Sequence, residues 1–453
     1  MKHTLKKFFF ASITFGISSL VWSADVLVRG GGGAGTQATP LERNIILGFV
    51  TLLIGGYFLK TWKKRKNYLD SVNNTIMESS LQDRIWEKNT IMNHVENVFF
   101  QFQKDWSDST PLPMREYLTE NYYRQIVLEL NILQNEKRKN EVLNPKIHHI
   151  TILEAHDDKD NTKDFFTAEI KARADDTLRD LETGKVLFSN QSSFTKYWKF
   201  VREGDTWKIE TIDQIMPNIE PKNGLLMTEW YRKVIEIFTK KQGFYYDIDF
   251  GRLMIPNKGV IFKKTSFQNS NVENHVIGYF RKKVVEFYTY MPYGNGRETF
   301  KKVLINFFTQ EIIFNGPGTN LLSPPLPPYK GGFFGFPFAF TVAQAVIPKS
   351  YFDILVRKKN KWWFNFGPWG LKKVSTESIA FDNRFCIWAD PRDRVNSLEL
   401  LTPNFMEKIY HLPFDLNIEV VGNFLYLYTK AQKEVDYDQM LEILSWAFDE
   451  MER

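Results

Sequence analysis

The sequence predicts an α+β fold that follows a secretory signal and one transmembrane helix. Three observations carry this prediction. Two apolar stretches lie near the N-terminus, long tracts with helical spacing of apolar residues begin at Leu81, and the spacing changes to a two-residue period near Phe166. Helices followed by a series of antiparallel strands are typical of an α+β domain. We therefore expect a cone-shaped domain with helices on an antiparallel sheet, and a second α+β domain after it.

The first apolar stretch has the pattern of a signal peptide over residues 1–23. Lysines precede the apolar run Phe8–Trp22, and the small residues Ser23 and Ala24 follow it. The Gly-rich segment over residues 24–43 would then lie outside the membrane. Removing this signal takes away three lysines and no acid, which lowers the formal net charge from +6 to about +3.

The second apolar stretch, residues 44–62, predicts a transmembrane helix. It approaches the necessary length of about 20 residues only if Lys60 and Trp62 serve as interfacial anchors. A core helix of a secreted protein is the alternative, but this stretch lacks the polar face of such a helix. Five positive charges in Lys60–Lys66 place the C-terminal side in the cytoplasm by the positive-inside rule. We expect a single-pass protein of a bacterial inner membrane with cytoplasmic C-terminal domains.

A basic cluster directly behind the predicted span opens a polar linker over residues 63–80. Much of the excess positive charge gathers there, which favours anionic lipid headgroups over nucleic acid as a partner. We predict anionic membrane lipid and an unidentified protein as partners and no nucleic acid, and leave the oligomeric state open. The predicted membrane-binding residues are Lys60, Lys63, Lys64, Arg65 and Lys66.

Residues 81–216 are predicted to form the first folded domain. Apolar residues recur at helical spacing over Leu81–Trp106 and again over Met114–Asn140. Alternation over Phe166–Arg173 predicts a strand, and Arg202–Asp205 predicts the turn of a hairpin. We expect the following side chains to form the core or the walls of an apolar pocket: Phe166, Ile170, Phe194, Trp198, Phe200 and Trp207.

Aromatic motifs in this domain resemble those of a known family. They occur in Val98–Trp106, Tyr117–Tyr122, Phe194–Arg202 and Trp207–Gln214. On these motifs, the block from about Leu81 to Ile215 resembles the C-terminal domain of the mitochondrial presequence-translocase membrane tether, the Tim44-like domain. The bacterial relatives are similar at the front too, with a signal, a Gly-rich tail and one span. The resemblance implies a domain that docks at a membrane.

The predicted function is a membrane-anchored tether or scaffold that docks lipid or protein partners at the cytoplasmic face of the inner membrane. One alternative is a secretion-machine component with its domains in the periplasm. Another is an enzyme that uses the pocket of the cone-shaped domain, with Glu169 and Asp213 as candidate carboxylates. Alternation places Glu169 on the solvent face, and Asp213 ends the last strand. We therefore predict no catalytic residue.

No motif predicts a metal, a cofactor or a covalent nucleophile. His148, His149 and His156 form the one histidine cluster in the sequence, but adjacent residues of a strand point to opposite faces. The sequence contains no His-Glu-x-x-His, no P-loop and no Gly-x-Ser-x-Gly. The single cysteine, Cys386, excludes an intrachain disulfide.

Residues 220–453 are predicted to form a second α+β domain of unknown function. Thr402 and Pro403 predict a helix start, because Thr caps free amides and Pro fits the first turn. The run Phe381–Met406 resembles a bacterial domain family of unknown function found in membrane-associated proteins. An uncharged tract over residues 331–347 favours a loop and strands of the core. Its alternative is a wedge that enters the bilayer or takes a peptide, formed by Phe333, Phe334, Phe336, Phe338 and Phe340.

Overall fold

The computed structural model describes residues 63, 65–213, 226–247, 253, 255–256, 258–262, 270–291, 340–359, 370–392, 399–430 and 437–452. The predicted signal peptide, Gly-rich segment and span lie outside these residues. Among the described residues, no helix combines the length and the apolar character needed to cross a bilayer. From Ser71 onward the described residues belong to one compact unit.

A helix over residues 65–82 occupies the stretch that the sequence analysis assigns to a polar linker. Val72 and Ile76 lie four positions apart, so they share one face of this helix, and both are buried in the core. Two buried apolar side chains among many polar ones give a weak periodic signal, which is why the helix was not predicted. Leu81, expected on a buried face, is 83% exposed.

The tract predicted as one helix from Leu81 to Trp106 is interrupted near its start. A short 3₁₀ helix, η1 (Arg84–Trp86), forms where the Asp83 carboxylate accepts a hydrogen bond from the Ile85 amide. The long helix α3 (Lys88–Ser107) follows and buries the predicted apolar face through residues such as Val95, Phe99 and Trp106. Next comes the single turn α4 (Pro111–Met114).

The second predicted helix, Met114–Asn140, is shorter in the structure. Helix α5 (Glu120–Asn135) begins where the Thr119 hydroxyl accepts a hydrogen bond from the Tyr122 amide at 3.3 Å. It ends because Lys137 adopts a left-handed conformation, with φ of 57°, and the chain continues as a strand. Residues 138–140 are therefore strand and not helix.

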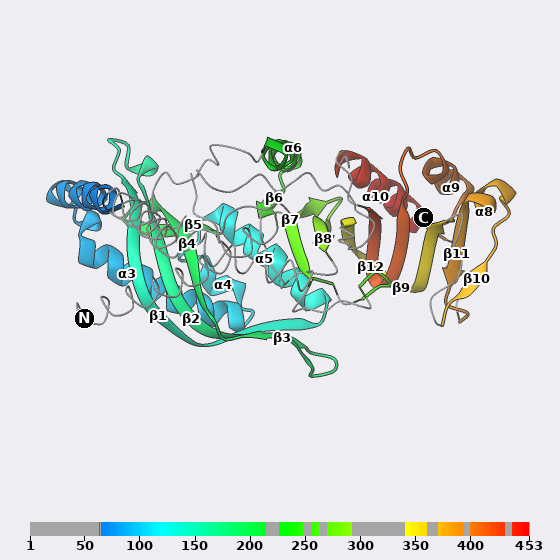
Figure 1. The fold of residues 1–453 in the computed structure, drawn as a ribbon, viewed down its shortest axis with the longest axis horizontal. Helices are drawn as coiled ribbons and strands as arrows, with labels where there is room; N and C mark the ends of the chain where they lie inside the picture. Colours follow the sequence, from blue (N-terminus) through cyan, green and yellow to red (C-terminus); the bar gives the residue numbers. More distant parts are fainter. Residues whose placement is uncertain are drawn as a thin grey trace, which may run out of the picture. The chain divides into compact units, whose positions relative to one another are not determined.

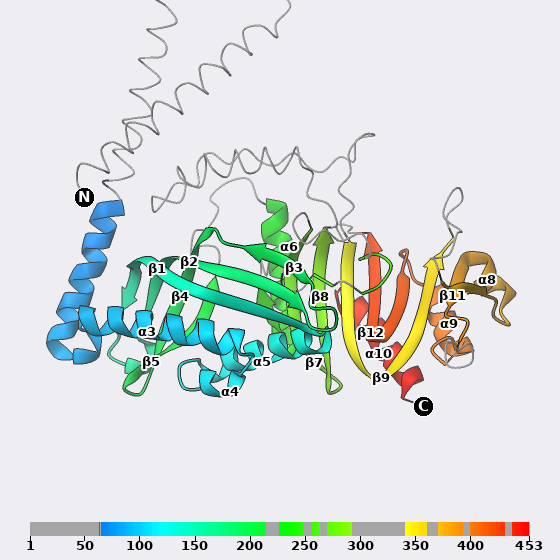
Figure 2. The same ribbon diagram turned by 90° about the horizontal axis from the view of Figure 1, so that it is seen from below.

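An antiparallel five-stranded sheet follows, with α3 along one face (Figure 2). Its order is β1-β2-β4-β5, and β3 pairs with β2. The apolar face predicted for β2 is confirmed, because Phe166, Ala168, Ile170 and Ala172 are all fully buried, but Thr167 and Glu169 on the opposite face are buried as well. The turn η2 (Asn161–Lys163) joins the first two strands. The strands are β1 (Arg138–His156), β2 (Phe165–Asp180), β3 (Val186–Asn190), β4 (Ser193–Glu203) and β5 (Thr206–Asp213).

A seven-stranded antiparallel sheet is built from the rest of the chain, in the order β10-β11-β9-β8-β7-β6, with β12 beside β9. The 19-residue strand β9 organises this sheet. Its first part pairs with β8 and its last part with β11, while β12 pairs with both parts on the other side. The strands are β6 (Tyr245–Asp247), β7 (Asn271–Phe280), β8 (Lys283–Met291), β9 (Phe340–Lys358), β10 (Lys372–Val374), β11 (Phe385–Ala389) and β12 (Asn417–Lys430).

Three helices pack on one face of the second sheet (Figure 1). They are α6 (Leu226–Gln242), α9 (Pro403–Tyr410) and α10 (Tyr437–Met451). The predicted helix start is confirmed, since the Thr402 hydroxyl accepts a hydrogen bond from the Phe405 amide at 3.2 Å and Pro403 opens α9. The short helix α8 (Ile379–Arg384) directly precedes β11.

Candidate functional site

The predicted pocket of the first domain is filled by its own side chains. Trp198 and Phe200 on β4 are at most 1% exposed. The rings of Phe99 and Phe102 on α3 lie 5.6 Å and 5.5 Å from the Trp198 ring. Phe166 stacks on Phe200 with ring centroids 4.7 Å apart. These side chains form the core between α3 and the sheet, rather than the walls of a lipid-binding pocket.

Trp207 holds the helical segments against the β4–β5 hairpin. Its ring lies 4.8 Å from that of Trp86, edge to face, and its indole nitrogen donates a hydrogen bond to the Ile85 carbonyl at 3.3 Å. The His94 ring nitrogen lies 2.8 Å from the Trp207 carbonyl oxygen. Burial lowers the pKa of His94, which favours the neutral ring at this position. Of the predicted residues, Ile170 is also fully buried and Phe194 is half-buried.

A series of hydrogen bonds between polar groups lies at one end of this aromatic core. The indole nitrogen of Trp106 donates a hydrogen bond to the Asn140 side-chain oxygen at 2.7 Å, and the Asn140 amide donates to the Asp176 carboxylate at 2.6 Å. Burial raises the pKa of Asp176, although the bond from Asn140 and the charge of Lys196 lower it. The sequence analysis missed this series because Asn140 was assigned to a helix.

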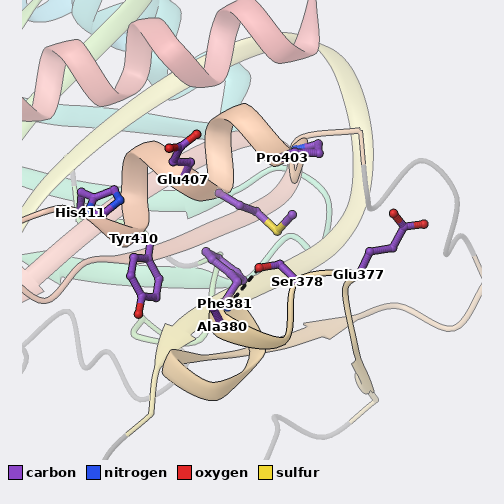
Figure 3. A pocket seen from close by; sticks show the side chains of 9 residues that line it. Glu377, Ser378, Ala380, Phe381, Pro403, Glu407, Tyr410 and His411 are labelled. Carbon is purple, nitrogen blue, oxygen red and sulfur yellow. Dashed lines mark hydrogen bonds between the residues drawn. The ribbon is translucent and has the colours of Figure 1, made fainter.

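A hollow of about 430 Å³ lies between α8 and α9 in the second domain (Figure 3). Met406 and Tyr410 of α9 and Phe381 of α8 all line it, so the hollow lies where two short helices meet. The sequence analysis recognised the start of α9 but could not place it beside α8. The lining residues are Glu377, Ser378, Ala380, Phe381, Pro403, Met406, Glu407, Tyr410 and His411.

Comparisons with known proteins identify the first domain. Residues 72–214 match the model of the Tim44-like domain family. This stretch is a Tim44-like domain. The match begins within the helix over residues 65–82, whose buried face belongs to the same core. None of the curated proteins matches the chain.

Two solved structures show distant likeness. The mycobacterial trehalose monomycolate transport factor A, TtfA, is 10% identical, with a TM-score of 0.30, and the match covers 48% of this chain and 89% of that one. The intermembrane space region of the chloroplast protein ARC6 is 14% identical, with a TM-score of 0.22, and the match covers 26% of this chain and 92% of that one.

The two candidate carboxylates lie on the face of the Tim44-like sheet opposite its aromatic core. Glu169 and Asp213 both stand opposite Tyr197 in the strand register, whereas the neighbouring Trp198 points into the core. Glu169 is 3% exposed, which corrects its assignment to a solvent face, and the Lys171 ammonium lies 3.5 Å from it. Neither carboxylate faces the aromatic core, as an enzyme using that pocket would require.

The histidine cluster of the Tim44-like domain lies along β1. His148 and His149 are exposed neighbours on this strand, and His156 at its end lies 3.8 Å from the Asp158 carboxylate. Across the described ranges, no three His, Cys, Asp or Glu side chains gather closely enough to hold a metal ion.

The predicted membrane-contacting residues are only partly described. Lys63 and Lys66 are exposed and Arg65 is half-buried, whereas Lys60 and Lys64 lie outside the described residues. Phe333, Phe334, Phe336 and Phe338 of the predicted wedge also lie outside them. Phe340 belongs to β9, where it pairs in register with Tyr290 and Lys430, so it is part of the sheet and not of a wedge.

A buried ion pair follows the end of α5. The guanidinium of Arg138 lies 2.8 Å from the Glu136 carboxylate, and neither side chain is more than 2% exposed. The amide of Gln344 on β9 donates a hydrogen bond to the same carboxylate at 3.4 Å, and the Tyr288 hydroxyl donates to Gln344 at 2.8 Å. Burial raises the pKa of Glu136 to about 7, although Arg138 lowers it. The sequence did not predict this buried pair, because Gln344, which donates a hydrogen bond to it, lies far away in the chain.

Proposed function

We propose that this chain is a membrane-anchored docking scaffold that holds its Tim44-like domain at the cytoplasmic face of a bacterial inner membrane. The observation that carries the proposal is the helix over residues 65–82. It starts within the basic cluster and continues into the first residues of the Tim44-like match. One helix therefore connects the basic cluster to the Tim44-like domain. The family resemblance found in the sequence also implies docking at a membrane.

Docking would use the surface of the Tim44-like domain rather than its interior. The space between α3 and the sheet is occupied by rings such as Phe99, Trp198 and Phe200. An acyl chain could enter there only by displacing these side chains from a close-packed core, which is costly. The proposed lipid contact is therefore electrostatic, between the basic cluster and anionic headgroups.

The vesicle test uses a fragment that begins at Lys63 and so contains every described residue. We expect it to bind anionic vesicles and to be released by salt, because each basic residue near the surface contributes about 1 kcal/mol within a Debye length of about 10 Å at 0.1 M salt. Changing Lys63, Lys64, Arg65 and Lys66 to Gln should remove most of the binding. Co-sedimentation with vesicles of phosphatidylglycerol and phosphatidylcholine measures the loss.

A matched control removes the same number of charges elsewhere. Four exposed lysines of the second domain serve this purpose, and their change to Gln should leave most vesicle binding intact. If both quadruple variants lose binding equally, the cluster is not the contact and lipid attachment through it is refuted. The control lysines are Lys240, Lys282, Lys372 and Lys373.

The orientation of the chain is tested with a reporter fused after Arg453. Because Lys60–Lys66 is strongly basic, we expect a reporter that is active only in the periplasm to stay silent, and a reporter that is active only in the cytoplasm to give signal. The opposite pair of results would place the domains in the periplasm and favour a secretion-machine component instead.

A further inference from the structure

The hollow between α8 and α9 has an apolar floor. Phe381 and Met406 are 1% and 6% exposed, and Ala380 and Pro403 complete the apolar lining. The Ser378 hydroxyl caps α8 by accepting a hydrogen bond from the Phe381 amide at 3.3 Å, so it is already engaged (Figure 3). The floor therefore suits an apolar group, and a flexible Met side chain lets it adapt to the shape of that group.

The exposed ionisable residues that line the hollow are two acids and one histidine, His411. Glu377 and Glu407 both line it, both are exposed, and neither forms an ion pair within the described part of the chain. Two described cations that are close in sequence to the lining residues are engaged with other groups. Arg384 donates a hydrogen bond to the Tyr410 carbonyl and lies 4.8 Å above the Tyr410 ring, and Lys408 lies 5.0 Å above the Trp446 ring.

An exposed apolar side chain extends this surface. Ile379 is 78% exposed on α8, next in sequence to the lining residues Ser378 and Ala380. A single exposed apolar residue is ordinary. Here Ile379 lies next to an apolar hollow that is also lined by two carboxylates without an ion pair. A molecule that binds there should therefore carry an apolar group and positive charges.

We propose that this hollow docks a short segment of a partner protein that presents one large apolar side chain flanked by lysines or arginines. The apolar side chain fills the space between Phe381 and Met406, and the flanking cations meet Glu377 and Glu407. The energy comes mainly from burying the apolar anchor, and the charge pairs add selectivity.

The charges and the lining argue against other occupants. An anionic lipid headgroup would meet two carboxylates of its own sign. A polar small molecule would need several convergent hydrogen-bonding groups inside the hollow, whereas its buried lining side chains are those of Phe381 and Met406. The proposal depends neither on membrane anchoring nor on the Tim44-like domain, so it can fail or succeed independently of the proposed function.

The test measures fluorescence anisotropy of a short fluorescein-labelled peptide with one central tryptophan between lysines, titrated with the full chain. We expect saturable binding that weakens as salt is raised. The double variant Glu377→Gln, Glu407→Gln should weaken it by about fivefold, as expected for two exposed charge pairs. Ala380→Trp, which fills the hollow from an exposed helix position, should weaken it by at least about tenfold.

Control variants on α10 remove one carboxylate or introduce one tryptophan. Glu442→Gln and Gln439→Trp alter exposed positions away from the hollow and should leave peptide affinity unchanged. Thermal midpoints that match the parent protein show that each variant is folded. The proposal is overturned if the peptide does not saturate, if Ala380→Trp binds as tightly as the parent, or if a peptide with alanine in place of tryptophan binds equally well. If the parent protein does not bind the peptide and Ala380→Trp loses binding to anionic vesicles, the hollow binds lipid instead. That result would also overturn the proposal.

Discussion

Truncating Trp207 to alanine is expected to lower the free energy of unfolding of the Tim44-like domain by about 3–5 kcal/mol. The side chain is 2% exposed and contacts Trp86 and Phe166 edge to face, with ring centroids 4.8 Å and 4.9 Å away. Its indole nitrogen also donates to the Ile85 carbonyl. Truncation therefore leaves a cavity and removes a hydrogen bond that ties the helical segment before α3 to the hairpin.

Urea denaturation followed by far-UV circular dichroism measures this loss. Leu112→Ala is the control, because Leu112 is 72% exposed and its truncation should change stability by less than about 0.5 kcal/mol. Trp207→Phe keeps most of the ring and should lie between the two. A Trp207→Ala protein with unchanged stability but lost partner binding would contradict the core assignment and make this position a binding surface.

The second large effect is a pH dependence of stability that comes from Glu136. Its pKa is raised from an ordinary value of 4.5 to about 7, because burial disfavours the carboxylate more than Arg138 favours it. Between these two values the folded state holds a proton that the unfolded state has released. The contribution of Glu136 to stability is thus fully present below pH 4.5 and falls as the pH rises to about 7, by about 3 kcal/mol in total.

Glu136→Gln replaces the carboxyl with a neutral group of the same shape and should abolish this loss. The variant should match the parent protein near pH 4 and exceed its stability above pH 7, by about 3 kcal/mol. Thermal unfolding of both proteins from pH 4 to 8 gives the difference, which cancels contributions from other groups such as His94. Glu116→Gln, at an exposed position, is the control and should show no such difference. Parallel pH profiles for parent and Glu136→Gln would refute the assignment.

The elements that could be predicted from the sequence are those encoded by local patterns. The alternation over Phe166–Arg173 gave β2, and the Thr402-Pro403 dipeptide gave the start of α9, because capping and strand alternation act over a few residues. Elements without such a local pattern could not be predicted. His148 and His149 were treated as neighbours on a strand, but the extent of β1 was not predicted because its burial pattern is irregular, with shifts in its pairing to β2 that break a two-residue period.

The candidate sites could be predicted only where one segment supplies them. The basic residues Lys63–Lys66 are contiguous in the sequence, and their contact with lipid stays a prediction. The hollow between α8 and α9 depends on two helices separated by β11, and the pair Glu136–Arg138 meets Gln344 across 208 positions of sequence. Residue spacing within one segment does not predict contacts between segments that are so far apart in the sequence. The aromatic residues of β4 and β5 were identified, but only packing against α3 shows that they are core.

The pairing of α6 with α10 has a consequence for synthesis on the ribosome. Phe238 of α6 packs against Tyr437 of α10, and Lys241 forms an ion pair with Asp438, 197 positions later. At about 5–20 residues per second, translation leaves α6 without this partner for roughly 10 to 40 s. All helices and strands of the Tim44-like domain have been synthesised before that interval begins, although the pair Glu136–Arg138 still lacks Gln344 of β9, and the second sheet must wait for β12 and α10. We therefore expect the later half of the chain to expose apolar surface for longer during synthesis and to depend more on chaperones.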